Sequence, residues 1–169
     1  MKKIVLITIL ILLILPGRDA SAKVKDIPEV DVTEVVRRHK AAADAFIAAM
    51  ILRHESIELL AQVIFWENWY TDKDKRAAYL TGAVAMNRVK SDYWPPTVKA
   101  VLYQKGQYST TQYFFTKEIP DECYEMARDI YINGTPDVPY NVVFQATFAQ
   151  GYGDWIPPIN GEHFCYGRA

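Results

Sequence analysis

The spacing of apolar residues changes near residue 134, and this change limits the folds open to the chain. Before that point, apolar side chains recur at the intervals of amphipathic helices. In residues 142–149 they alternate, which places Phe144, Ala146 and Phe148 on one face of a strand and Gln145 and Thr147 on the other. Helices followed by a small sheet predict an α+β fold, mainly helical with a small antiparallel sheet toward the C-terminus.

Boundary residues divide the chain into expected elements. Ser56 has the residue type of an N-cap, and Pro95-Pro96 ends one element and starts another because proline suits the first turn of a helix. Asn133-Gly134 is a helix stop, and residues 163–166 are expected to form a last strand. We expect the helix before Ser56 to pack on the domain as an accessory element. The expected helices cover residues 33–53, 56 to about 70, 75–90, a short segment with Val98, Val101 and Leu102, and 121–133.

The first residues have the order of a secretory signal peptide. Lys2 and Lys3 precede an apolar run, Ile4–Leu15, and the small residues 20–22 (Ala-Ser-Ala) form an A-x-A cleavage site. The run is shorter than the ~20 residues that a membrane-spanning helix needs, although an uncleaved N-terminal anchor is the alternative. We expect residues 1–22 to be a signal peptide, 23–55 a linker and accessory helix, and 56–169 the main domain of a secreted protein without a stable membrane anchor.

Charge and composition restrict the partners and cofactors. The formal net charge is −1 at pH 7, so we expect no nucleic-acid partner. His54-Glu55 lacks the second histidine of a zinc-binding HExxH helix because position 58 is Glu58, so we expect no metal site and no cofactor. Aromatic residues make up 13% of the chain and suit either sugar rings or an ordinary core. We expect a monomer.

The two cysteines leave two possibilities open. Export would permit a disulfide between Cys123 and Cys165, but their positions in the sequence do not show that they meet. In an extended segment, His163 and Cys165 share a face and could form a Cys/His nucleophile. Nothing else in that segment resembles a nucleophile site, so we do not favour this reading.

Glu67 is the first candidate for chemistry. Leu60, Ile64 and Glu67 are spaced i, i+4, i+7, which puts this carboxyl group on an apolar stripe. Burial disfavours the charged form, and a carboxyl group that is still protonated near neutral pH can donate a proton to a leaving oxygen. The alternative is that Glu67 faces water and caps or pairs at the helix end. Its aromatic neighbours are Phe65, Trp66, Trp69 and Tyr70.

Several other polar residues are candidates for substrate binding. Leu80, Val84 and Asn87 share a helix face, so the amide of Asn87 either bridges loops structurally or orients Glu67 or a substrate. Arg88 is expected to pair with an acid. Each remaining candidate either binds substrate or has only a structural role in the fold. These candidates are Gln107, Tyr108, Ser109, Gln145, Thr147 and Gln150.

Four blocks of sequence carry a resemblance to a known family. They read LLAQVIFWEN (59–68), GAVAMNRV (82–89), YWPPTV (93–98) and GQYS (106–109), with weaker matches at 134–137 and 163–166. In this order and spacing they resemble the SleB-type cell wall hydrolases, the spore-cortex-lytic family. The resemblance covers roughly residues 57–166.

The resemblance implies a lysozyme-like α+β fold, a peptidoglycan substrate and one essential glutamate, which aligns with Glu67. It also implies a catalytic domain over residues 56–169 and a cell-wall location. Family members that are lytic transglycosylases cut between N-acetylmuramic acid and N-acetylglucosamine, and the muramic acid 6-hydroxyl closes a 1,6-anhydro ring. That reaction needs one acid that then acts as a base.

The sequence departs from the family pattern directly after the glutamate. Many members read Glu-Ala-x-Gly-Glu, whereas residues 67–71 read Glu-Asn-Trp-Tyr-Thr, so the second acid of the block is missing. Asp72 or Asp74 could replace it, but both fall in an expected solvated turn. The pattern therefore favours a lytic transglycosylase, with hydrolysis still open. A muramoyl-amide hydrolase and a non-catalytic peptidoglycan-binding module remain alternatives.

Overall fold

The computed structural model describes residues 31–168, and the predicted signal peptide and most of the predicted linker lie outside these residues. The chain divides into two units between Ala45 and Phe46, which is within helix α2 (Val32–Ile64). Within residues 31–168, no helix is both long enough and apolar enough to cross a membrane. The expected domain boundary between residues 55 and 56 stays a prediction.

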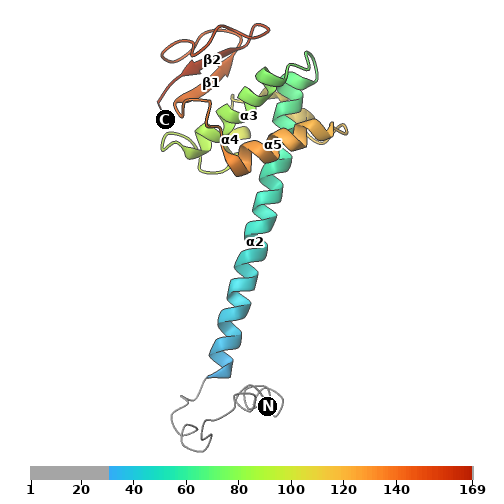
Figure 1. Cartoon of the computed structure of the whole chain (residues 1–169), viewed down its shortest axis with the longest axis vertical. Coiled ribbons are helices and arrows are strands. Elements are labelled where there is room, and N and C mark those ends of the chain that lie inside the picture. Colours follow the sequence, from blue (N-terminus) through green and yellow to red (C-terminus); the bar gives the residue numbers. More distant parts are fainter. Residues whose placement is uncertain (1–30, 169) are drawn as a thin grey trace, which may run out of the picture. The chain divides into compact units, whose positions relative to one another are not determined.

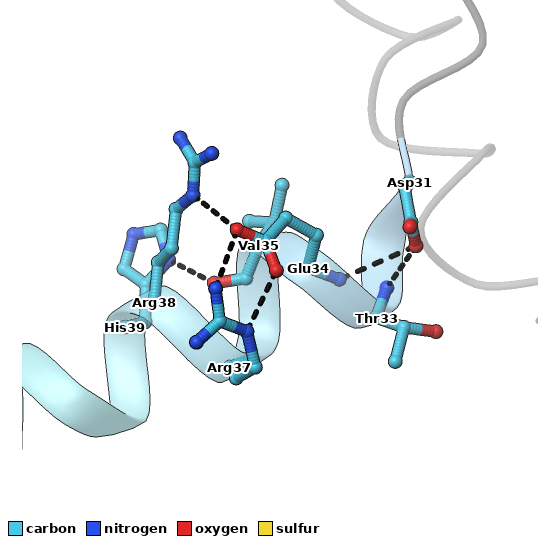
Figure 2. Close-up of polar contacts among 7 residues, drawn as sticks. All are labelled: Asp31, Thr33, Glu34, Val35, Arg37, Arg38 and His39. Carbon is cyan, nitrogen blue, oxygen red and sulfur yellow. Dashed lines mark hydrogen bonds and ion pairs between the residues drawn. The ribbon is translucent and has the colours of Figure 1, made fainter.

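The described part of the first unit is the start of α2, which short-range polar contacts stabilise. Figure 2 shows the Asp31 carboxylate accepting hydrogen bonds from the backbone nitrogens of Thr33, at 2.9 Å, and Glu34, at 3.2 Å. Glu34 in turn pairs with Arg37 and Arg38, at 2.7 and 2.5 Å. An N-cap stabilises a helix by ~1 kcal/mol, and exposed pairs at this spacing add only a few tenths.

Residues 46–64 continue α2 without the break that we expected at Ser56. The Ser56 hydroxyl donates to the Leu52 carbonyl, at 2.8 Å, instead of capping a new helix. Phe46 and Ile51 are 68% and 64% exposed, and burial begins at Ser56. Phe46 and Ile51 are thus not buried within the second unit, and the packing of the expected accessory helix on the domain stays a prediction.

The other expected helices are confirmed, and Figure 1 shows them grouped in the second unit: α3 (Lys75–Lys90), α4 (Val98–Leu102) and α5 (Asp121–Asn133). Asp74 caps α3, and Gly134 ends α5 with a φ of 78°, in the left-handed region. Helix α3 is buried along most of its length because it packs against α4, α5 and the sheet.

The sheet confirms the α+β class. Strand β1 (Val142–Ala146) pairs antiparallel with β2 (His163–Tyr166), and Gln145 lies opposite Phe164. β1 ends earlier than the predicted residue 149, so Phe148 is 61% exposed. Before β2, the turn residues Asn160 and Gly161 have φ values of 51° and 82°. Asn-Gly is the favoured pair for such a tight hairpin turn.

Two adjacent side chains of α3 attach the sheet to the helices. The Asn87 amide donates to the carbonyl oxygens of Pro139 and Val142, at 2.9 and 3.0 Å. Nε of Arg88 donates to the Val143 carbonyl at 2.6 Å. Asn87 thus has the structural bridging role, and Arg88 binds a backbone carbonyl where we expected an acid.

We predict that Asn87→Ala lowers the free energy of unfolding by about 1–3 kcal/mol, since it leaves buried carbonyl groups without a donor. Chemical denaturation with urea measures this difference. Asn133→Ala is the matched control because the Asn133 amide bonds only Asp129 on the exposed face of α5, and its effect should stay within about 0.5 kcal/mol. Equal effects of the two substitutions would show that Asn87 does not hold the sheet.

Candidate active site

A change in helix type positions Glu67. Regular α-helix ends at Ile64, and Phe65–Trp69 form a π-helical turn, η2, in which the backbone nitrogen of Tyr70 donates to the Phe65 carbonyl at 2.8 Å. Such turns occur often at functional sites because they redirect side chains. The next residue, Asn68, is buried, and its amide donates to the Thr81 hydroxyl of α3 at 2.6 Å. This bond fixes the backbone on one side of Glu67.

The Glu67 carboxyl group is half-buried, in agreement with its position on the apolar stripe. Burial is the main cause that raises its pKa, and the negative charge of Glu162 raises it further. A hydrogen bond from the Thr110 hydroxyl and the positive charge of Arg88 act in the opposite direction. The net effect is a raised pKa, as the apolar spacing predicted.

A cavity of about 340 Å³ opens beside Glu67. Its walls come from η2, the end of α3, the loop at 106–108, β1 with the residues that follow it, and the turn before β2. The lining residues are Glu67, Arg88, Gly106, Gln107, Tyr108, Phe144, Gln145, Ala146, Thr147, Gln150 and Glu162.

Most of the residues that we predicted from the sequence as site residues lie together around this cavity. Two do not: Asn87, which is used to attach the sheet, and Ser109, which begins the 3-10 helix η3 (Ser109–Tyr113). Thr110, one position after Ser109, is the residue of this segment that bonds Glu67. The predicted site residues that line the cavity are Glu67, Gln107, Tyr108, Gln145, Thr147 and Gln150.

Two cavity residues hold buried polar atoms that have no hydrogen-bond partner within residues 31–168. They are the Tyr108 hydroxyl and both polar atoms of the Gln145 amide. Buried polar groups in folded proteins nearly always have partners. The wall therefore offers a hydroxyl group and an amide group to a ligand that carries hydrogen-bonding groups of its own.

Arg88 brings a positive charge to the same cavity. Its guanidinium carbon lies 4.3 Å from the centre of a Trp94 ring and 5.2 Å from the Tyr108 ring. These contacts, together with the bond to the Val143 carbonyl, hold the cation in place. An anionic group that forms in the cavity would be stabilised by this charge.

Glu162 is the cavity residue that our reading of the sequence missed. It is half-buried and follows the Asn160-Gly161 turn directly. That Asn-Gly pair was the available signal, because it predicts a hairpin whose second strand begins at Glu162. The two acids that we had considered lie elsewhere: Asp72 is exposed, and Asp74 caps α3.

The two cysteines are free thiols, so the disulfide that the sequence permitted is not formed. Sγ of Cys165 donates to Oδ1 of Asp154 at 3.1 Å, and Nδ1 of His163 lies 2.9 Å from the same oxygen. Burial raises the pKa of the Cys165 thiol, whereas a nucleophilic cysteine needs a lowered pKa. This group therefore does not have the properties of a Cys/His nucleophile.

The part of the chain that the structure describes holds no group of three or more histidine, cysteine, aspartate or glutamate side chains placed to bind a metal ion. The polar atoms of the cavity are instead hydroxyl, amide, carboxyl and guanidinium groups. These groups can transfer protons and bind a neutral, hydrogen-bonding ligand.

We predict that Glu67→Gln leaves stability unchanged at low pH and increases it at neutral pH. Because burial raises the pKa of Glu67 in the folded state, the unfolded chain ionises first as the pH rises. The wild-type protein therefore loses stability as the pH rises from the pKa of Glu67 in the unfolded chain to its higher pKa in the folded protein. The Glu67→Gln variant has no ionisable group at this position and does not lose this stability. Urea unfolding at pH 4 and pH 7.5 tests this, and an equal or lower stability of the variant at pH 7.5 would contradict it.

Comparison with known proteins gives a family match. The model of the Cell Wall Hydrolase family matches residues 61–160, which include Glu67, Arg88, the 106–108 loop and β1. Neither the curated proteins nor the solved structures include a match to the chain. The family match covers more than half of the chain and runs through the sequence blocks on which the resemblance depended. The chain is therefore a member of the Cell Wall Hydrolase family.

Proposed function

We propose that this protein cleaves the glycan strand of peptidoglycan between N-acetylmuramic acid and N-acetylglucosamine, with Glu67 as the general acid. The observation that carries the proposal is a half-buried carboxyl group with a raised pKa at the wall of a polar cavity. The family match supports a cell-wall substrate. The protein then acts outside the cell, at the wall.

Cleavage of a glycosidic bond requires a proton on the leaving oxygen, and Glu67 is suited to supply it. A general acid works best when its pKa lies near the pH at which the enzyme operates, because it must be protonated and still able to donate. Burial moves the pKa of Glu67 in that direction. The Thr110 hydroxyl, which donates to one carboxyl oxygen, orients the group.

The cavity has the size and chemistry to hold a sugar ring with an N-acetyl group. Its volume of about 340 Å³ falls in the range of small-molecule sites. The unpartnered Tyr108 hydroxyl and Gln145 amide provide donors and acceptors, and Phe144 provides an apolar surface. Amino sugars carry hydroxyl and amide groups around an apolar ring, so the two surfaces are complementary.

Two forms of the reaction use such an acid. In the transglycosylase form, which the resemblance implies, Glu67 would later accept a proton from the muramic acid 6-hydroxyl. In the hydrolase form, water attacks the sugar. We favoured the first form because the second acid after Glu67 is missing, but Glu162 provides a second carboxyl group in the cavity.

We predict that Glu67→Gln abolishes most glycan cleavage, with a fall in rate of roughly 10²–10⁴-fold, because glutamine cannot donate a proton to the leaving oxygen. Release of muropeptides from purified peptidoglycan measures the rate. Glu118→Gln is the matched control, since Glu118 is exposed and lies outside the cavity lining.

In the wild type, activity should fall as the pH rises through the raised pKa of Glu67 and its acid form is lost. Full activity of Glu67→Gln would exclude Glu67 as the acid. Binding of peptidoglycan without any release of fragments by the wild type would indicate a non-catalytic wall-binding protein.

We predict that Tyr108→Phe weakens substrate binding without loss of stability. The Tyr108 hydroxyl has no partner within the described chain, so its removal costs the folded protein no hydrogen bond. A lost bond to substrate of about 0.5–1.5 kcal/mol would raise KM by roughly two- to tenfold. Steady-state kinetics on soluble glycan fragments test the substrate binding, and urea unfolding tests the stability. An unchanged KM would show that Tyr108 does not bind the substrate.

A further inference from the structure

Glu162 is a second carboxyl group in the Glu67 cavity, and it comes from a different part of the chain. Glu67 lies in η2, whereas Glu162 follows the Asn160-Gly161 turn at the start of β2. Backbone hydrogen bonds between Ile159 and Glu162, at 3.0 and 2.9 Å, hold that turn closed. Both carboxyl groups line the same cavity of about 340 Å³.

The register of the sheet explains why Glu162 faces the helical part of the unit. Phe164 is fully buried in a cluster with Leu80 and Val84 of α3, so its face of the sheet is the one that packs on α3. Residues two apart in a strand share a face, which places Glu162 beside Phe164 on that side. Gln145, the direct partner of Phe164, lies on the same face.

We propose that Glu162 is the base that activates a water molecule for attack on the glycan, while Glu67 protonates the leaving oxygen. This inference rests on the proposed function and selects its hydrolytic form. Two carboxyl groups that flank a sugar and leave space for a water are the arrangement of inverting glycosidases, in which they lie about 6.5–9.5 Å apart. The cavity is many times larger than the ~30 Å³ that a water molecule occupies.

The step balances with these two groups alone. The water oxygen forms a bond to C1 of N-acetylmuramic acid as one water proton passes to the Glu162 carboxylate. The bond between C1 and the 4-oxygen of N-acetylglucosamine breaks, and that oxygen keeps the electron pair and takes the proton of Glu67. The products are a reducing muramic acid end and a free 4-hydroxyl group. Solvent then takes the proton from Glu162 and returns one to Glu67.

Burial raises the pKa of both carboxyl groups. For Glu162 the net direction of the pKa shift is upward, because burial outweighs the opposing positive charge of His163. The charge on an ionised Glu162 in turn favours the protonated form of Glu67. When one of two neighbouring carboxyl groups is ionised, its charge makes the other hold its proton more tightly, so the pair can supply one base and one acid.

Digestion of peptidoglycan by the wild-type protein in H₂¹⁸O tests the role of water directly. We expect each new muramic acid end to be reducing and to carry one ¹⁸O atom, detected by mass spectrometry after borohydride reduction. Muropeptides with 1,6-anhydro ends and no ¹⁸O would overturn the proposal, because the nucleophile would then be the substrate's own hydroxyl group.

Substitution of Glu162 tests the base. We expect Glu162→Gln to lower the rate of ¹⁸O-labelled product formation by roughly 10²–10⁴-fold, and Glu162→Asp, which keeps a carboxylate, to retain more activity than Glu162→Gln. Glu118→Gln, which is exposed, again serves as the matched control. Circular dichroism and thermal unfolding establish that each variant is folded; if Glu162→Gln does not fold, the digestion in H₂¹⁸O decides.

The outcomes separate this inference from the proposed function. If the wild type cleaves glycan and requires Glu67, but Glu162→Gln keeps the wild-type rate, only the role of Glu162 is overturned. In the case that Glu162→Gln does not fold, 1,6-anhydro ends without ¹⁸O in the wild-type digest overturn that role. If the wild type releases no fragments from peptidoglycan, both proposals are overturned.

Discussion

The attachment of β1 to α3 is the contact on which the rest of the site depends. A two-stranded sheet has little stability by itself, so it needs a helix to cover its apolar face. Asn87 and Arg88 supply side-chain donors to three backbone carbonyl groups at the start of β1. Because β1 is fixed at this end, Gln145 and the paired strand that begins beside Glu162 are brought to the cavity that Glu67 also lines.

A second set of buried polar contacts holds the segment around Glu67. The Asn68 amide donates to the Thr81 hydroxyl of α3. Gln62 of α2 accepts hydrogen bonds from the indole of Trp66, one turn later, and from the backbone nitrogen of Phe115. Polar networks of this kind are costly unless every member is satisfied, and when satisfied they favour one arrangement. The hydrogen bond from Thr110 only partly offsets the effect of burial on the Glu67 carboxyl group. Its raised pKa is therefore a cost to stability that the fold tolerates at the site of the proposed reaction.

The sequence by itself determined the elements whose signals are local. Apolar spacing and the stop at Gly134 are set by residues a few positions apart, and α3, α5 and β2 follow these signals closely. The position of Glu67 on an apolar stripe also predicted the direction of its pKa shift. The polar residues of the 106–108 loop and of β1 were recognised as site residues because they stand out from their surroundings in type.

Only the tertiary structure decided which polar groups meet. Glu162 lies far from Glu67 along the chain, and the register of β1 with β2 brings both to one cavity. The hydrogen bond from Thr110 joins η3 to Glu67 in the π turn at residues 65–69, and helical spacing reveals neither this turn nor this contact. The amide of Asn87 was recognised as buried, but its partners lie more than 50 residues away, so its role depended on the packing of α3 against β1. Local spacing fixes which face a side chain occupies, whereas its partners are set by contacts between distant segments.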